Sequence, residues 1–194
     1  EIPYNIQQTS DGGYIVAGSG NGLMAAGEMQ SAPCRNDYSG TSTDMLVVKL
    51  DSGGNVSWYT FLGDSGSDTA ASVHQTSGGG YIVAGKTNAA IGAGRMQDVT
   101  PLINYSGGQD MLVVKLDASG YVAWYTFLGS ASGNDFANSV DQTSDGGYVV
   151  AGVANATIDT LQGISPIISF SGGTNNDMLV VKLDSSGNVA WYTF

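Results

Sequence analysis

Apolar residues along this chain gather in short runs that are separated by turns rich in Gly, Ser, Asp and Asn. Three kinds of run follow one another in a fixed order: Tyr-(Ile/Val)-Val-Ala, Met-Leu-Val-Val-Lys-Leu and Trp-Tyr-Thr-Phe. Short apolar runs bounded by turn residues are typical of β-strands. No segment carries apolar residues at i, i+3, i+4 and i+7 over a useful length, so the pattern predicts an all-β chain with essentially no helix.

The same order of runs occurs three times. The tyrosine of the first run recurs every 67 residues, and the tryptophan of the last run recurs after 66 and 67 residues. A fixed internal period means that one supersecondary unit is used repeatedly. The copies are residues 1–62, 63–128 and 129–194, and their markers are Tyr14, Tyr81 and Tyr148 with Trp58, Trp124 and Trp191.

Each copy is predicted to contain four strands joined as an up-and-down meander. In the first copy these strands are residues 6–9, 14–17, 45–50 and 56–62. Tight turns join the first strand to the second and the third to the fourth, and glycine supplies the positive φ that such turns need. In the third copy we expect that conformation at Gly147, so that Gly147→Val would be costly.

The third strand of each copy favours one sheet architecture over others. Its residues 45–48 are apolar at consecutive positions, which indicates a strand buried on both faces. A β-sandwich covers only one face of each sheet, whereas radially packed propeller blades cover both. The sequence therefore predicts a β-propeller built from three tandem four-stranded blades, one in each copy.

The repeated motif is most complete in the second copy. It runs Gly-Gly-Tyr-Ile-Val-Ala-Gly at 79–85, Ser-Gly-Gly-Gln-Asp at 106–110 and Val-Val-Lys-Leu-Asp at 113–117. This motif resembles the bacterial SBBP β-propeller repeat, and the resemblance covers nearly the whole chain. It implies a secreted or cell-surface propeller, nominally of seven blades, from a family without a defined chemistry.

Three blades are too few for an ordinary closed ring, which needs four to eight. Either the three blades are part of a larger ring completed by further repeats of the same polypeptide, or another copy of the chain completes it. Each open flank would carry the Met, Leu, Val, Tyr and Trp side chains that pack between blades elsewhere. A head-to-tail contact between flanks predicts self-association, as a six-bladed homodimeric ring or as a filament.

Composition narrows the choice of partners. Seventeen Asp and Glu face six Lys and Arg, for a net charge of −11, so nucleic acid and anionic membrane surfaces are not expected partners. No apolar stretch reaches the length that spans a bilayer, so we expect no membrane insertion. The possible partners that remain are the chain itself, another protein or a glycan.

The long connections between the second and third strands hold the candidate ligand-binding residues. These connections are residues 19–43, 86–109 and 153–176, and loops of this length are usually functional. One interpretation is a set of aromatic loops that binds a glycan or protein; the other is that their apolar residues anchor each loop to its own blade. The candidates are Tyr38, Tyr105 and Phe170 with Gln30, Gln97 and Gln162.

The chain has few residues of the types that form catalytic sites. His74 is the only histidine and Cys34 the only cysteine, so a nucleophilic triad and a zinc site both lack ligands or partners. A carboxylate pair for glycoside hydrolysis remains open because acids are plentiful. Most acids, however, recur at equivalent turns, whereas an active site should break the repeat symmetry. In the last hairpins we expect these acids to form Asx turns, at Asp51, Asp117 and Asp184. We predict no catalytic residue, no metal site and no cofactor.

These observations favour a non-catalytic extracellular module that acts as a surface scaffold, an adhesion element or a self-assembling structural protein. The alternative is a glycan-binding module that uses the long loops, since sugar rings stack on aromatic faces. A glycosidase-like enzyme is the least favoured class.

Overall fold

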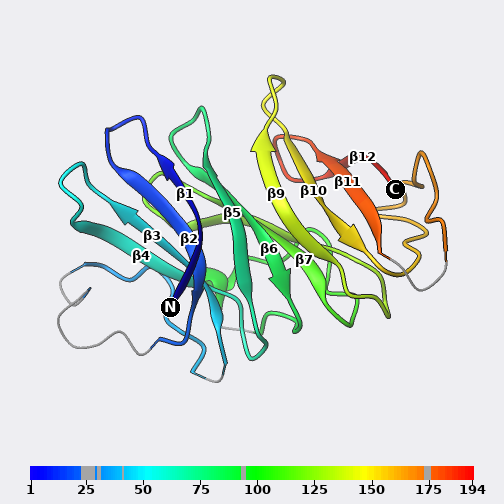
Figure 1. The fold of residues 1–194 in the computed structure, drawn as a ribbon, viewed down its shortest axis with the longest axis horizontal. Coiled ribbons are helices and arrows are strands. Elements are labelled where there is room, and N and C mark those ends of the chain that lie inside the picture. Colours follow the sequence, from blue (N-terminus) through cyan, green and yellow to red (C-terminus); the bar gives the residue numbers. More distant parts are fainter. Residues whose placement is uncertain (23–28, 30–31, 41, 93–94, 173–175) are drawn as a thin grey trace.

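The computed structural model describes residues 1–22, 29, 32–40, 42–92, 95–172 and 176–194. Its strands form three four-stranded antiparallel sheets, each in chain order, and Figure 1 shows the sheets side by side along the molecule. The first sheet contains β1 (Ile2–Gln8), β2 (Tyr14–Gly20), β3 (Asp44–Leu50) and β4 (Val56–Leu62). The second contains β5 (Thr69–Gln75), β6 (Tyr81–Thr87), β7 (Asp110–Leu116) and β8 (Val122–Leu128), and the third β9 (Phe136–Gln142), β10 (Tyr148–Ala154), β11 (Asp177–Leu183) and β12 (Val189–Thr193).

The prediction of an all-β chain is confirmed. The one helical element among the described residues is the short 3₁₀ turn η1 (Met96–Asp98). Each sheet falls within one of the three expected segments, and the described residues form no closed ring. The sheet-level architecture therefore consists of three meander sheets with an uncovered face at each end of the row.

The first strand of each sheet begins earlier than the apolar pattern predicts. β1 starts at Ile2 instead of residue 6, because the pairing of β1 with β2 shifts between Pro3 and Asn5. A β-bulge of this kind inserts an extra residue and interrupts the alternation of side chains that marks a strand in the sequence. The same irregularity occurs between Ala70 and Ser72 in β5.

The bulges explain the glycine that ends each Val-Ala-Gly run. Gly18 lies opposite the bulge of β1, and a Cβ there would overlap the carbonyl oxygen of Ile2. The expectation of a positive φ at Gly147 is wrong, because Gly146 adopts it, with φ 81°. Gly147 is needed for a different reason: a Cβ there would strike the carbonyl oxygen of Leu183.

The sheets pack face to face through two apolar clusters. β2 contacts β5 and β6 contacts β9, while the first strands β1, β5 and β9 contact one another in series. In β7, Leu112 and Val114 belong to the cluster with the first sheet, and Met111 and Val113 belong to the cluster with the third. The prediction that the third strand is buried on both faces is thus confirmed for the middle sheet.

Polar side chains join the first strands of neighbouring sheets. The backbone N–H of Val73 donates to Asn5 Oδ1 at 3.1 Å, and that of Gln75 donates to Gln7 Oε1 at 2.7 Å. Nδ1 of His74 lies 3.7 Å from a carboxylate oxygen of Asp141 on the next sheet. The polar residues of these strands therefore satisfy backbone groups and neighbours across the junctions between sheets.

Candidate functional site

The aromatic residues of the long loops pack against a phenylalanine in the last strand of their own sheet or, for Phe170, directly after it. Each ring is partly buried and makes an edge or tilted contact with a phenylalanine. The hydroxyl group of Tyr105 also donates to the carbonyl of Gly108 at 2.7 Å, and that of Tyr38 donates to the carbonyl of Ser42. The ring pairs, with centroid distances of 5.6, 5.8 and 5.5 Å, are Tyr38–Phe61, Tyr105–Phe127 and Phe170–Phe194.

The loop glutamines hold the start of the last strand. Gln97 Oε1 accepts from the N–H of Val122 at 2.7 Å, while Gln97 Nε2 donates at 3.0 Å to the carbonyl of Arg35, on the loop between β2 and β3. Gln162 Oε1 accepts from the N–H of Val189 in the same way, at 2.7 Å. Gln30 lies outside the described residues. The amide groups of Gln97 and Gln162 are thus engaged within the chain.

Replacing Tyr105 by alanine is expected to lower the free energy of unfolding by about 1–3 kcal/mol, because the loop loses its ring contact and a hydrogen bond. Chemical denaturation monitored by tryptophan fluorescence measures this change. Ser132→Ala, on an exposed loop, is the control. A Tyr105→Ala variant with unchanged stability but lost binding on a glycan array would contradict this interpretation and favour a glycan site.

Buried carboxylates lie where one sheet passes to the next. Asp110 is fully buried and accepts from the N–H and hydroxyl groups of Ser106, at 2.7 and 2.8 Å. Asp135, also fully buried, accepts from the N–H of Ser130 at 2.7 Å, and its Oδ1 has no hydrogen-bond partner among the described residues. Burial raises the pKa of both groups, for Asp110 to about 6. A carboxylate pair that solvent does not reach offers no access to a glycoside.

The acids of the last hairpins have local roles. Asp51 accepts from the N–H of Gly53 at 2.9 Å and of Asn55 at 2.8 Å, and Asp117 and Asp184 make the equivalent bonds. These are the Asx turns that the sequence predicts, and they are confirmed. Among the described residues, no three His, Cys, Asp or Glu side chains come together as metal ligands would. In the same part of the chain, no helix has the length and apolar character needed to cross a bilayer.

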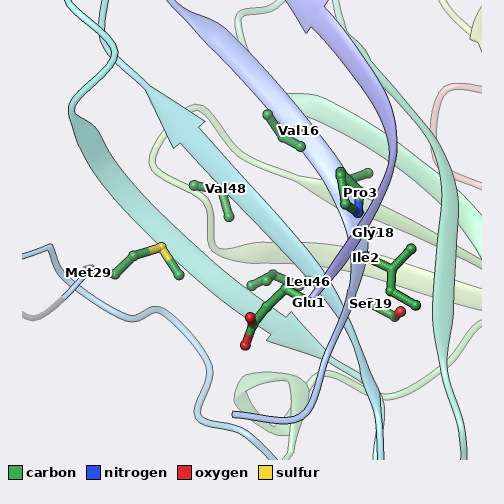
Figure 2. Close-up of a pocket in the computed structure, with 10 residues that line it drawn as sticks. Glu1, Ile2, Pro3, Val16, Gly18, Ser19, Met29, Leu46 and Val48 are labelled. Carbon is green, nitrogen blue, oxygen red and sulfur yellow. The ribbon is translucent and has the colours of Figure 1, made fainter. Parts of the chain in front are cut away.

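The face of the first sheet that points away from the second is named outer face 1, and it comprises Ile6, Tyr14, Val16, Gly18 and Val48. Ile6 is 62% exposed there, whereas the equivalent Val73 and Val140 are buried between sheets. A hollow of about 290 Å³ opens on this face between β1, β2 and β3. Figure 2 shows it lined by Val16, Gly18, Leu46 and Val48, with Pro3 and Met29 at its margin.

The opposite end of the row is named outer face 2, and it comprises Val149, Met178 and Trp191. Met178 is 67% exposed, although the equivalent Met45 and Met111 are fully buried. Trp191 is 38% exposed, against 6% for Trp58. The sequence predicts that each flank carries apolar side chains. The structure adds which individual side chains are exposed there, because equivalent residues of the three sheets differ in burial.

Comparison of the chain with protein-family models and with curated proteins gives no match. The resemblance to SBBP repeats therefore stays a prediction from the repeated motif, and the function has to be argued from the geometry of the sheets.

Proposed function

We propose that this chain is a non-catalytic, β-propeller-type scaffold module of a secreted or cell-surface protein, extended by further sheets that stack on its two outer faces. The observation that carries the proposal is the contrast in burial between equivalent residues. Met178 is 67% exposed on outer face 2, while Met45 and Met111 are fully buried between sheets. Soluble monomers rarely expose contiguous apolar faces, and such faces mark sites of association.

The use of polar groups supports a scaffold over an enzyme. The carboxylates of Asp110 and Asp135 are buried and bonded to neighbouring serines, and that of Asp51 shapes a hairpin. These roles recur from sheet to sheet at equivalent positions. A catalytic site needs groups that reach a substrate with matched pKa values. Because the acids have the same structural roles in each sheet, the loops and the outer faces are the surfaces through which the module acts.

The isolated 194-residue chain is expected to associate in solution, because no segment that the structure describes covers its outer faces. Light scattering coupled to size-exclusion chromatography measures the assembly. The protein concentration is varied from about 1 to 100 μM, the range in which weak protein interfaces dissociate. Circular dichroism on the same samples checks that the sheets are intact. A folded monomer of 19.9 kDa at every concentration would contradict the proposal.

A further inference from the structure

The two junctions inside the chain are built alike. At each junction, the tryptophan of one sheet lies over a tyrosine and a glycine of the next. Trp58 lies with its ring centroid 5.6 Å from that of Tyr81, and a Cβ added to Gly120 would be 2.8 Å from its indole. The corresponding set at the second junction, with the same two distances, is Trp124, Tyr148 and Gly187.

A methionine forms a second contact at the junction between the second and third sheets. Met111 is fully buried, and its Cε would lie 2.8 Å from a Cβ added to Gly152. Gly152 is the glycine opposite the bulge of β9, so the missing side chain leaves room for the methionine end. At the first junction the equivalent Met45 is likewise fully buried.

The outer faces carry the separate halves of these two contacts. Outer face 2 presents Met178 and Trp191, both exposed. Outer face 1 presents Tyr14 and the hollow at Gly18, and at its edge lies the exposed Gly54. Apart from its chain neighbours, no described residue comes within 4 Å of a Cβ added to Gly54. Gly54 is the equivalent of Gly120 and Gly187, both of which are buried under a tryptophan.

The sequence of the third sheet matches the part of the second sheet that already makes such a junction. β11 and β7 are both Asp-Met-Leu-Val-Val-Lys-Leu, and β12 repeats the Val-Ala-Trp-Tyr-Thr that opens β8. On the receiving side, β2 and β10 share Tyr-(Ile/Val)-Val-Ala-Gly. Outer face 2 therefore carries the residues with which the second sheet already packs on the third, and outer face 1 carries the residues that receive them.

We propose that outer face 2 of one copy docks head to tail on outer face 1 of a second copy, with Met178 in the hollow at Gly18 and Trp191 over Tyr14 and Gly54. This docking rests on the proposed scaffold function and names its partner. A methionine side chain has four heavy atoms. At roughly 30 Å³ for each water-sized group, these atoms need on the order of 120 Å³. The hollow of about 290 Å³ is large enough to hold them. Because the contact is heterologous, two copies close a ring of six sheets or many copies form a filament.

Three variants test the docking. Met178→Asp places a charge on outer face 2, and Ile6→Asp places one on outer face 1; both residues are exposed in the single chain, so folding should be kept. Gly78→Asp is the matched charge control, since the exposed Gly78 occupies the turn position that holds Asp11 and Asp145 in the other copies. Sedimentation velocity and circular dichroism are recorded for each variant.

The wild-type chain and Gly78→Asp are expected to associate alike, and more strongly as salt screens the net charge of −11. Met178→Asp and Ile6→Asp should each weaken association at least a hundredfold, because each buries an unpaired charge in the junction. Mixed in equal amounts, these two variants should form a one-to-one dimer that grows no further, since each retains one intact outer face.

Three results would overturn the docking, and they distinguish its failure from the failure of the scaffold proposal. Assembly that persists in Met178→Asp and Ile6→Asp, or a mixture of the two that does not associate while the wild type does, leaves the scaffold proposal standing and refutes this geometry. A folded wild-type chain that stays monomeric refutes both.

Discussion

Replacing Trp58 by alanine is expected to lower the free energy of unfolding by about 3–5 kcal/mol. Trp58 is 6% exposed and fills the junction between the first two sheets, against Tyr81 and Gly120. Removing the indole leaves a cavity that closes only if both sheets shift, because close-packed interiors relax only in part. Urea denaturation followed by far-ultraviolet circular dichroism measures the change.

The repeat supplies the matched control. Trp191 is the equivalent residue on outer face 2, and Trp191→Ala is expected to cost less than about 1 kcal/mol, because an exposed side chain leaves no cavity. The comparison is made in a Met178→Asp background, so that docking of copies does not cover Trp191. Trp124, which is partly buried on Tyr148, should fall between the two. Equal losses at Trp58 and Trp191 would contradict the assignment of the outer faces.

The free energy of unfolding is also expected to fall by about 4 kcal/mol or more as the pH rises from about 4 to about 8. Burial, together with the charges of the nearby acids Asp44 and Asp64, raises the pKa of Asp68 from 3.8 to about 7. Burial likewise raises the pKa of Asp110 to about 6. A folded-state pKa above the unfolded one gives stabilisation that is complete below about pH 4 and is lost as the pH rises through the folded value. One pKa unit corresponds to about 1.4 kcal/mol, so Asp68 alone accounts for about 4 kcal/mol.

The exposed turn acids act in the opposite direction at lower pH. Hydrogen bonds from Lys49 lower the pKa of Asp11, and those from Thr143 and Lys182 lower the pKa of Asp145. A lowered pKa gives stabilisation that is present above the unfolded value and is lost as the pH falls through the folded one. Maximum stability is therefore expected near pH 4–5, between the two groups of acids.

Asp68→Asn tests the cause of this pH dependence. The substitution removes the ionisable group while keeping the shape of the side chain, so the fall between about pH 4 and about pH 8 should shrink by about 4 kcal/mol, the part that Asp68 contributes. Denaturation curves across this range measure it, with Asp159→Asn, an exposed acid on the loop between β10 and β11, as the control. An unchanged slope in Asp68→Asn would show that other groups control the dependence.

Local chemistry explains why so much of the architecture was predictable. The apolar runs, the turn residues and the 67-residue period each depend on neighbours in the sequence, and they located four strands per sheet and the Asx turns at Asp51, Asp117 and Asp184. Where the prediction failed, a partner distant in the sequence was responsible. The early start of β1 depends on a bulge against β2, and the need for Gly147 depends on the carbonyl of Leu183.

Less of the candidate site than of the fold could be predicted from the sequence. The sequence identified the loop residues Tyr38, Tyr105 and Phe170. Their contact with a phenylalanine in or directly after the last strand depends on how each loop returns over its sheet. In the same way, the raised pKa of Asp68 arises from burial at a junction between sheets, which no local pattern reports.

The sequence by itself determined an all-β chain of three equivalent four-stranded units, because strand alternation and turn chemistry are local properties of the backbone. Only the tertiary structure decided which equivalent residues are buried. Met45, Met111 and Met178 occupy the same place in three nearly identical strands, and a neighbouring sheet covers the first two but not the third. Burial is a property of what packs against a surface, so identical sequences acquire different roles according to their position in the row of sheets.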